Sequence, residues 1–266
     1  MKKTGLILLA VLMVLTAAIP CAALGEGEKD LLAQIRERGE IVIATEGDWA
    51  PWTYVDEKNV LTGFDVELGQ EIAKELGVTA KFEVTAWDSI LAGVDAGRFD
   101  LACNGVSYTE ERAKAYKFST PYLFTPSVLV VREDNDTIHS FEDLSGKKTA
   151  NTISSIYAGI AEEYGATVEG VDTLLDTLEL VKQGRVDATI NAKVSIDDYL
   201  AVHPDAPIKI AAEMEGDIVV IPIRNVPEAE SLLEAVNAAL QAMRDDGRLK
   251  ALSEKYFGAD LTQAGE

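Results

Sequence analysis

Cysteine and histidine are scarce in this chain of 266 residues, and the motifs of familiar catalytic sites are missing. The chain holds two cysteines and two histidines, with no CxxC pair and no H-E-x-x-H motif. It also lacks a G-x-S-x-G turn and a glycine-rich phosphate loop. His139 and His203 lie in polar, loop-like contexts, which favours surface positions. We therefore expect no metal site, no cofactor and no catalytic residue.

Long apolar runs are absent beyond the N-terminus. Lys2 and Lys3 precede the apolar residues 5–19, a run too short to span a bilayer comfortably, and small residues follow it. This pattern is typical of a secretory signal peptide, predicted here as residues 1–25 and removed on export. The location is then periplasmic or otherwise extracytoplasmic. Lipid anchoring at Cys21 is an alternative, which Pro20 directly before it disfavours.

Basic residues are few relative to acidic ones. Without Lys2 and Lys3 the chain has 22 basic and 45 acidic residues, so its formal charge changes from −21 to −23. Such an acidic surface argues against nucleic acid and against an anionic membrane as partners. Cys103 is then the one remaining cysteine, so no intramolecular disulfide forms and stability must come from hydrophobic cores.

One sequence unit occurs twice. Residues 97–104 read GRFDLACN and residues 184–191 read GRVDATIN, and each follows a predicted amphipathic helix. The order of helix, glycine, buried strand and terminal asparagine is half of an open α/β sheet, although a chance match in ordinary α/β sequence is the alternative. Such sheets bind ligands at the carboxyl ends of their strands. Asn104 and Asn191, which end the two strands, therefore become candidate ligand-binding residues.

Periodicity predicts two lobes with repeated α/β units and two chain crossings between them. Lobe 1 comprises residues 38–122 plus 222–260, and lobe 2 comprises residues 126–216. The crossings lie at about 122–126 and 216–222 and form a hinge. The predicted strands are 41–45, 80–84, 99–103, 127–131, 148–151, 167–171, 186–191 and 217–223. The predicted helices are 28–38, 64–76, 87–96, 155–164, 174–183, 227–244 and 249–256.

Two segments suggest a carboxylate site between the lobes. Arg112 follows a predicted N-cap at Thr109, and its guanidinium could return to the strand mouth beside Asn104 and Ser107. Pairing of Arg112 with its neighbouring glutamates is the alternative. In lobe 2, Ser154 and Ser155 open a helix whose N-terminus favours an anion, with ordinary capping as the alternative.

Aromatic residues suggest the walls of a pocket. Trp49 and Trp87 each follow a strand and could enclose the apolar part of a ligand, whereas we assign Trp52 to the core.

Glu46 ends the first strand and could bind a positively charged group of a ligand. A solvated glutamate is the alternative.

Residues from about 38 to 256 resemble the periplasmic amino-acid-binding proteins of ABC importers, family 3 of the solute-binding proteins. The motifs that carry this resemblance are GFDVE (63–67), WDSILAG (87–93), RFD (98–100), TEER (109–112), FSTPY (118–122) and GRVDA (184–188). The segment 87–89, Asn104 and the pair Tyr157-Ala158 are most similar to the cystine- and cysteine-binding branch. The resemblance implies an α/β, two-lobed fold of the type II periplasmic-binding-protein class, each lobe being an open α/β sheet.

The resemblance also implies roles for particular residues. Arg112 and the Ser107 backbone would hold the α-carboxylate of an amino acid, assisted by Ser155 and the Ile156 N–H. Trp49 and Trp87 would flank its side chain. The Asn104–Gly105 backbone would accept from the α-amine. Many relatives have aspartate where this chain has Ala192, so Glu46 or another acid would replace it here.

These observations predict a non-enzymatic, monomeric receptor that delivers a polar L-amino acid, cystine or cysteine by preference, to an ABC transporter permease. One alternative is a periplasmic enzyme on the same scaffold, similar to cyclohexadienyl dehydratase, which would need a general acid deep in the cleft. The other is a sensor ectodomain, disfavoured because no membrane helix or output domain follows.

Overall fold

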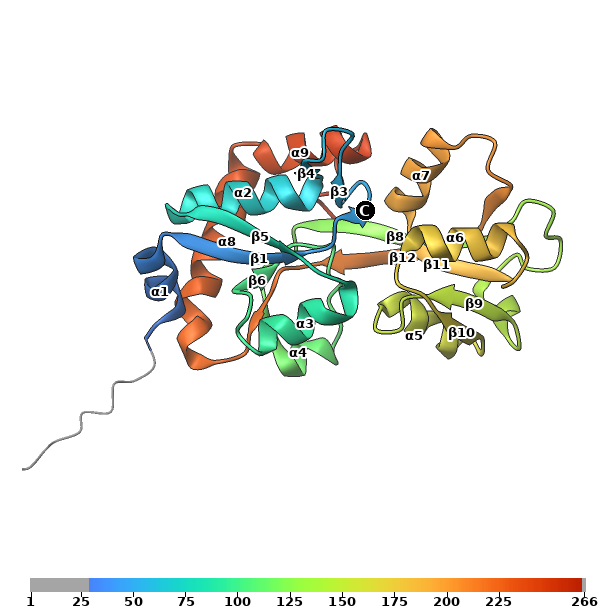
Figure 1. The fold of residues 1–266 in the computed structure, drawn as a ribbon, viewed down its shortest axis with the longest axis horizontal. Coiled ribbons are helices and arrows are strands. Elements are labelled where there is room, and N and C mark those ends of the chain that lie inside the picture. Colours follow the sequence, from blue (N-terminus) through green and yellow to red (C-terminus); the bar gives the residue numbers. More distant parts are fainter. Residues whose placement is uncertain (1–28, 265–266) are drawn as a thin grey trace, which may run out of the picture.

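The computed structural model describes residues 29–264 and has two lobes joined by two long adjacent strands (Figure 1). The signal peptide predicted for residues 1–25, including Cys21, lies outside the described residues. Within the described part of the chain, no helix has both the length and the apolar composition needed to cross a membrane.

The first lobe is built on a five-stranded sheet with the order β5-β1-β6-β13-β7. β1 runs parallel to β5 and β6, and β13 runs antiparallel to β6 and β7. These strands are β1 Glu40–Thr45, β5 Thr79–Val84, β6 Leu101–Ala102, β7 Tyr116–Phe118 and β13 Pro222–Arg224. A small antiparallel sheet lies beside it, formed by β2 Asp48–Trp49, β3 Thr53–Val55 and β4 Leu61–Thr62.

Six helices belong to the described part of this lobe, and their ends follow from local sequence. They are α1 Leu31–Arg38, α2 Phe64–Leu76, α3 Trp87–Asp95, α4 Arg112–Ala115, α8 Glu230–Asp245 and α9 Arg248–Phe257. In α2, two acidic residues in the first turn complement the helix dipole, and Gly77 ends the helix in the left-handed conformation. Its apolar face contacts β1 and β5 and the helices α8 and α9, which places the core between them.

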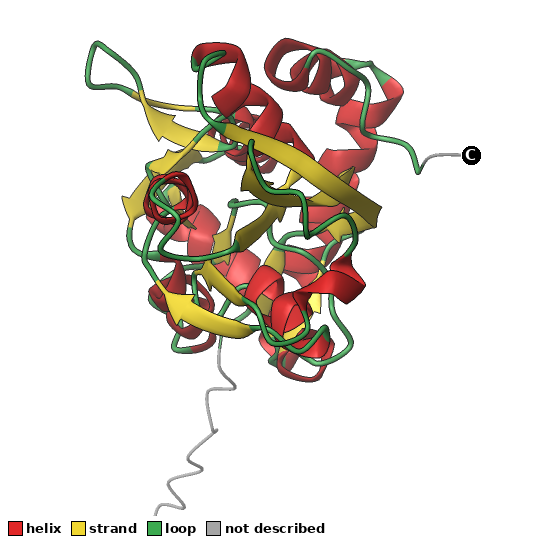
Figure 2. Cartoon of the chain, turned by 90° about the vertical axis from the view of Figure 1, so that its right-hand side faces the viewer, coloured by secondary structure: helices red, strands yellow, loops and turns green. Residues whose placement is uncertain are grey.

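The second lobe has a five-stranded sheet with the order β10-β9-β11-β8-β12. Its strands are β8 Leu123–Arg132, β9 Lys148–Asn151, β10 Thr167–Gly170, β11 Ala188–Ala192 and β12 Ile208–Val219. Three helices pack on this sheet: α5 Ile156–Glu163, α6 Leu174–Lys182 and α7 Lys193–Val202. Figure 2 views the molecule from this end and shows the strands between helices.

The two lobes are connected where β8 and β12 enter the first lobe. These strands pair antiparallel along the crossing, with Leu123 opposite Val219 and Thr125 opposite Asp217. Gly216 lies so close to β8 that a Cβ atom there would be 2.7 Å from the Thr125 carbonyl oxygen. A side chain at this position would therefore push the two strands apart.

The predicted strand 217–223 is wrong as one element, because the chain changes partners inside it. Its first part belongs to β12, and its last part forms β13 in the other sheet. Between them, Val220 N–H donates to the Val106 carbonyl and Ile221 N–H donates to Ser119 Oγ. These bonds hold the backbone at the point where the chain leaves the sheet of lobe 2 and enters the sheet of lobe 1.

Other boundaries differ by less. The predicted strand 99–103 forms as Leu101–Ala102 only, while β12 begins at Ile208, nine positions before the predicted start at 217. Helix α7 was not predicted, because Asp197 and Asp198 interrupt the apolar residues of its sequence KVSIDDYLAV. The helices α2 and α6 begin where the sequence predicts, and β9 has the predicted bounds.

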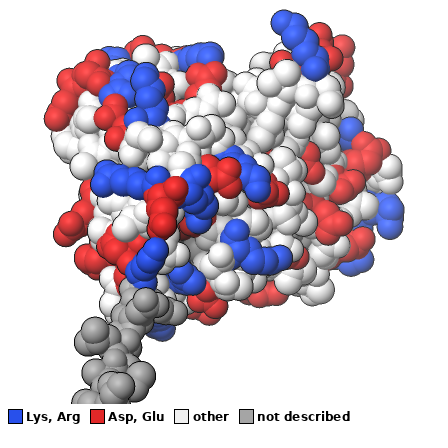
Figure 3. All heavy atoms as spheres, turned by 60° about the vertical axis from the view of Figure 1, so that its left-hand side comes forward, with Lys and Arg blue, Asp and Glu red and all other residues white. Residues whose placement is uncertain are grey.

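Charge is dispersed over the surface rather than gathered into one basic patch on the face shown in Figure 3, where red and blue side chains alternate. Arg248, for example, forms ion pairs with Glu71, Glu75 and Asp246. The formal charge of −21 is thus carried mostly by solvated side chains. Cys103, in contrast, is fully buried beside β1, and burial raises the pKa of its thiol well above the ordinary value.

Candidate ligand-binding site

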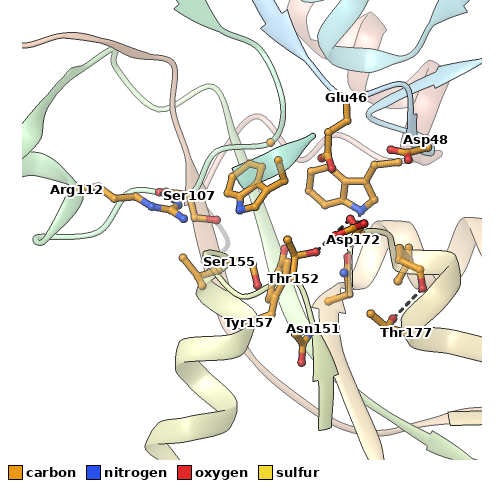
Figure 4. Close-up of a pocket in the computed structure, with 16 residues that line it drawn as sticks. Glu46, Asp48, Ser107, Arg112, Asn151, Thr152, Ser155, Tyr157, Asp172 and Thr177 are labelled. Atoms are coloured by element: carbon orange, nitrogen blue, oxygen red, sulfur yellow. Dashed lines mark hydrogen bonds between the residues drawn. The ribbon is translucent and has the colours of Figure 1, made fainter. Parts of the chain in front are cut away.

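A cleft opens between the two lobes at the carboxyl ends of their strands (Figure 4). Together with the open solvent at its mouth, the empty space of the cleft measures about 570 Å³. Lobe 1 contributes Glu46, Asp48, Trp49, Trp87, Gly105, Ser107 and Arg112. Lobe 2 contributes Asn151, Thr152, Ser155, Ile156, Tyr157, Asp172, Leu174, Thr177 and Asn191.

Arg112 is fixed by its backbone and by two carbonyl groups. Thr109 Oγ1 accepts from Arg112 N–H at 3.0 Å, although the residue at the N-cap position of the short helix α4 is Glu111 and not the predicted Thr109. The guanidinium donates to the Ser107 carbonyl at 3.0 Å and, across the cleft, to the Ser154 carbonyl at 3.2 Å. Within residues 29–264 no ion pair joins it to Glu110 or Glu111, so its charge is left for a carboxylate. Burial lowers its pKa from the ordinary value.

Opposite Arg112, the N-terminus of α5 faces the cleft. Ser155 is the N-cap, and its Oγ accepts from Ala158 N–H at 3.2 Å. Ser155 and Ile156 both line the cleft, so the positive end of the helix dipole points into the cleft, an arrangement that favours an anion. The capping alternative and the anion-site prediction are therefore compatible at this position.

The tryptophans form one wall of the cleft. Trp49 and Trp52 stack with ring centres 5.3 Å apart and planes 18° apart, and Trp49 is the one of the pair that lines the cleft. Trp52 is buried in the core, as the sequence predicts. Gly105 packs against both rings, with no room for a Cβ atom, which would lie 2.7 Å from Trp49 Cζ3.

Trp87 differs from the other two tryptophans because its indole N–H has no hydrogen-bond partner among the described residues, whereas those of Trp49 and Trp52 have one. Its ring lies beneath the Arg112 guanidinium, whereas its Nε1 atom is buried without a hydrogen-bond partner among the residues that the structure describes. Trp49 Nε1 donates to Asn191 Oδ1 at 3.3 Å. A buried N–H that lacks a partner costs about 1–3 kcal/mol, so Trp87 is suited to donate to a ligand acceptor.

Glu46 is an acidic group at the end of β1 and is largely removed from water. Burial raises its pKa to about 7, which the hydrogen bond from Asn104 Nδ2 at 2.7 Å opposes. Asn104 Oδ1 in turn accepts from Glu46 N–H at 2.6 Å. Glu46 thus presents to the cleft a carboxyl group that is half ionised near neutral pH.

A partly buried acid, Asp217, lies behind the cleft on the crossing strand β12. Asp217 accepts from Tyr157 OH at 3.3 Å and from Ser127 Oγ at 3.2 Å. Burial raises its pKa to about 6, while the positive charge of Arg112 opposes that shift. The crossing strand β12 and the cleft are therefore electrostatically connected.

Hydrogen bonds join the two lobes, so the structure is in a closed arrangement. Three lie at the cleft: Arg112 to the Ser154 carbonyl, Ser154 Oγ to Asp88, and Trp49 to Asn191. A fourth is buried and joins Trp52 to Ser195 at 3.1 Å.

All but two of the predicted site residues line this cleft; the exceptions are Asn104 and Ser154. Asn104 is fully buried behind Glu46, and the Ser154 hydroxyl is directed to Asp88. Ala192 is buried and brings no charge. The ligand-binding role of each of these residues stays a prediction.

Several cleft residues are not among the ligand-binding residues predicted from the sequence: Asp48, Asn151, Thr152, Tyr157, Asp172, Leu174 and Thr177. Asp48 lies in the short strand β2 and Asp172 lies in a loop, and no sequence motif marks either position. Asn151, at the end of β9, occupies the same kind of position as Asn104 and Asn191, and that rule could have found it. Within residues 29–264, no group of three histidine, cysteine, aspartate or glutamate side chains could hold a metal ion.

Two open α/β sheets that are joined by paired crossing strands and enclose a cleft define a type II periplasmic binding protein. Residues 41–259 match the bacterial extracellular solute-binding proteins, family 3, and the chain belongs to this family.

Curated relatives and solved structures agree with this assignment. The L-cystine-binding protein TcyA of Bacillus subtilis (strain 168) is 38% identical over 99% of this chain and 100% of its own length. An ancestral arginine-binding protein bound to arginine superposes with a TM-score of 0.78 at 34% identity, covering 83% of this chain and 99% of its own. These matches extend over both lobes.

A third comparison concerns the closed arrangement. The L-cystine solute receptor of Neisseria gonorrhoeae, in an unliganded open conformation, gives a TM-score of 0.59 at 35% identity, covering 88% of this chain and 98% of its own. This TM-score is lower than that of the arginine-bound protein, although the sequence identities are similar, which agrees with lobes that are closed here.

An ancestral amino-acid-binding protein, a precursor of cyclohexadienyl dehydratase, gives a TM-score of 0.78 at 31% identity over 85% of this chain and 99% of its own.

Proposed function

We propose that this chain is an extracytoplasmic receptor that binds an L-amino acid, with L-cystine as the first candidate, and delivers it to the permease of an ABC importer. The observation that carries the proposal is the Arg112 guanidinium, which forms no ion pair within residues 29–264 and faces the N-terminus of α5 across the cleft. Together they suit one carboxylate held from both lobes. The name of the Bacillus subtilis relative supports cystine.

The remaining groups of the cleft take the other parts of the ligand in this proposal. Trp49 and Trp87 flank the side chain, and Ser107 and Ile156 assist at the carboxylate. The Gly105 backbone accepts from the α-amine, and the Glu46 carboxylate compensates for the missing acid at Ala192. Asn191 holds Trp49 in place through the bond to its indole N–H.

The domain boundaries and the state of the exported protein are part of the same proposal. Residues 38–122 plus 222–260 move against residues 126–216 about the crossings at 122–126 and 216–222. The antiparallel pairing of β8 and β12 supports this, because both crossing strands bend together. We further propose that residues 1–25 are removed on export, that Cys21 carries no lipid, and that the receptor acts as a monomer.

A ligand screen tests the function. The protein without residues 1–25 is heated in the presence of each proteinogenic amino acid and of L-cystine. A ligand present at about 100 times its Kd adds about 2.7 kcal/mol to the free energy of unfolding and raises Tm. We expect the largest increase with cystine. A screen in which no α-amino acid raises Tm would contradict the receptor.

A dehydratase is the second candidate, because Glu46 has the burial and the raised pKa that a general acid in a cleft requires. The structural neighbour described as a dehydratase precursor adds a reason to test it. Turnover of prephenate or arogenate by the wild type, lost in Glu46→Gln, would establish the enzyme. Tight binding of an amino acid without turnover would exclude it.

A further inference from the structure

One hydrogen bond between the lobes is buried and lies outside the cleft. Trp52 Nε1 in lobe 1 donates to Ser195 Oγ in α7 of lobe 2 at 3.1 Å. Each of the two residues is only 1% exposed, and neither lines the cleft. This bond therefore depends on how the lobes meet, and a ligand in the cleft does not touch it.

The environment of Trp52 makes its indole a rigid donor. The ring is packed edge-on against Phe64, with ring centres 6.0 Å apart. It also packs against Phe257, whose ring centre is 5.1 Å away. Its other face stacks on Trp49, the cleft wall. The position of the N–H is thus set by the core of lobe 1, and only movement of lobe 2 can make or break the bond.

Because the Trp52–Ser195 bond is buried, it favours the closed arrangement over the open one. An indole N–H is a donor only, and it loses its protein partner when the lobes separate. The bonds from Arg112 and Ser154 at the cleft are more exposed, so water can replace them at little cost. The Trp52–Ser195 bond is shielded from water, so its contribution to closure is larger.

From these observations we infer that Trp52 and Ser195 form a closing contact, a pair of positioning residues that favours the closed arrangement and raises affinity for every ligand by the same factor. The contact acts on the equilibrium between open and closed lobes, and this equilibrium is the same whichever ligand binds. Selectivity stays with the residues that line the cleft.

The test is Ser195→Ala, which removes the acceptor and one oxygen atom. Affinity for L-cystine, L-cysteine and L-arginine is measured by calorimetry. We expect each ligand that binds to be weakened by about 3- to 20-fold. The factors for different ligands should agree within about twofold, the usual limit of additivity for separate sites. The free energy of unfolding without ligand should change less than the binding free energy.

Two further variants make the result specific. Trp52→Phe removes the donor and keeps an aromatic ring, so the double variant Trp52→Phe/Ser195→Ala should bind no more weakly than Trp52→Phe alone. Ser231→Ala is the matched control, since its hydroxyl donates to Asp30 on lobe 1, away from the cleft, and it should bind like the wild type. If Ser195→Ala does not fold, Trp52→Phe alone decides by the same criterion of equal factors.

Three outcomes would overturn the closing contact: wild-type affinity in Ser195→Ala, unequal factors for different ligands, or additive losses in the double variant. The affinity measurements rest on the proposed function, whereas small-angle scattering does not. If the wild type binds no amino acid, the proposed function fails. The closing contact is then judged by the radius of gyration without ligand, which must be larger in Ser195→Ala; equal radii would contradict it.

Discussion

The guanidinium carbon of Arg112 lies 5.5 Å from the centre of the Trp87 ring, and both side chains line the cleft. A cation over an indole face gains about 0.5–2 kcal/mol, more when water is excluded. The contact holds the guanidinium against the aromatic wall and does not neutralise its positive charge, which a carboxylate can still meet. Ligand recognition and the aromatic wall are therefore coupled at this pair.

Arg112→Ala should weaken ligand binding by about 2–5 kcal/mol, because the ligand carboxylate would remain buried without its partner. Arg112→Lys is the matched variant. It keeps the charge but not the planar fork, so it should recover only part of the loss. Calorimetry on both variants measures this, and near-native affinity in Arg112→Ala would remove the carboxylate assignment.

Affinity for an ammonium-bearing ligand should rise between pH 5.5 and pH 7.5. Burial raises the pKa of Glu46 to about 7, so its carboxylate, the form that attracts an ammonium group, becomes the main form only above that value. The gain is at most about tenfold per pH unit, as expected for one titrating group. Glu46→Gln keeps an acceptor for Asn104 and should flatten the profile. Equal pH dependence in both proteins would exclude Glu46 as the titrating group.

Trp87→Phe should lower ligand affinity by about 3- to 10-fold without lowering the Tm of the ligand-free protein. Its indole N–H has no partner within residues 29–264, so the folded chain loses no hydrogen bond when it is removed. The loss appears only when a ligand acceptor is present. Thermal unfolding and calorimetry on the same variant separate the two effects. A fall in Tm with unchanged affinity would show that Trp87 has only a packing role.

The free energy of unfolding should contain a contribution from Asp65 that falls as pH rises. Asp65 is fully buried, accepts from Tyr122 OH at 2.8 Å and from the Gly105 N–H, and burial raises its pKa to about 7. The folded state keeps a proton that the unfolded state has lost above about pH 4. This contribution is therefore complete below pH 4 and is lost up to pH 7, with a slope of up to about 1.4 kcal/mol per pH unit.

Asp65→Asn isolates that contribution, because the amide does not titrate. Urea unfolding at pH 4.5, 5.5 and 7.5 should show the variant gaining stability relative to the wild type as pH rises. A difference that does not change with pH would contradict the raised pKa.

Elements with local signals were predictable from the sequence. Helix α2 lies between Gly63 and Gly77, and its bounds match the prediction because a strong apolar stripe meets a left-handed glycine. The pair of lobes followed from the repeated unit at 97–104 and 184–191. Both are properties of short segments.

What could not be predicted depends on contacts between distant residues. The division of 217–223 between two sheets follows from the partners Val106 and Ser119, which are remote in the sequence. Asn104 ends a strand as expected, but its side chain turns to Glu46, and only the packing of β1 against β6 determines that direction. The sequence assigned Trp52 to the core, but its second role across the lobes required the position of α7.

Under the proposed function, the first candidate ligand is L-cystine, whose side chain is itself a disulfide, and this makes the state of Cys103 chemically important. Exchange between a thiol and a disulfide requires a thiolate that can reach the sulfur in line. The Cys103 thiol is one residue from Asn104 and two from the cleft residue Gly105, yet it is fully buried and its pKa is raised. The described part of the chain therefore holds its one thiol inert inside the core, and a disulfide ligand of the proposed receptor would leave in the redox state in which it arrived.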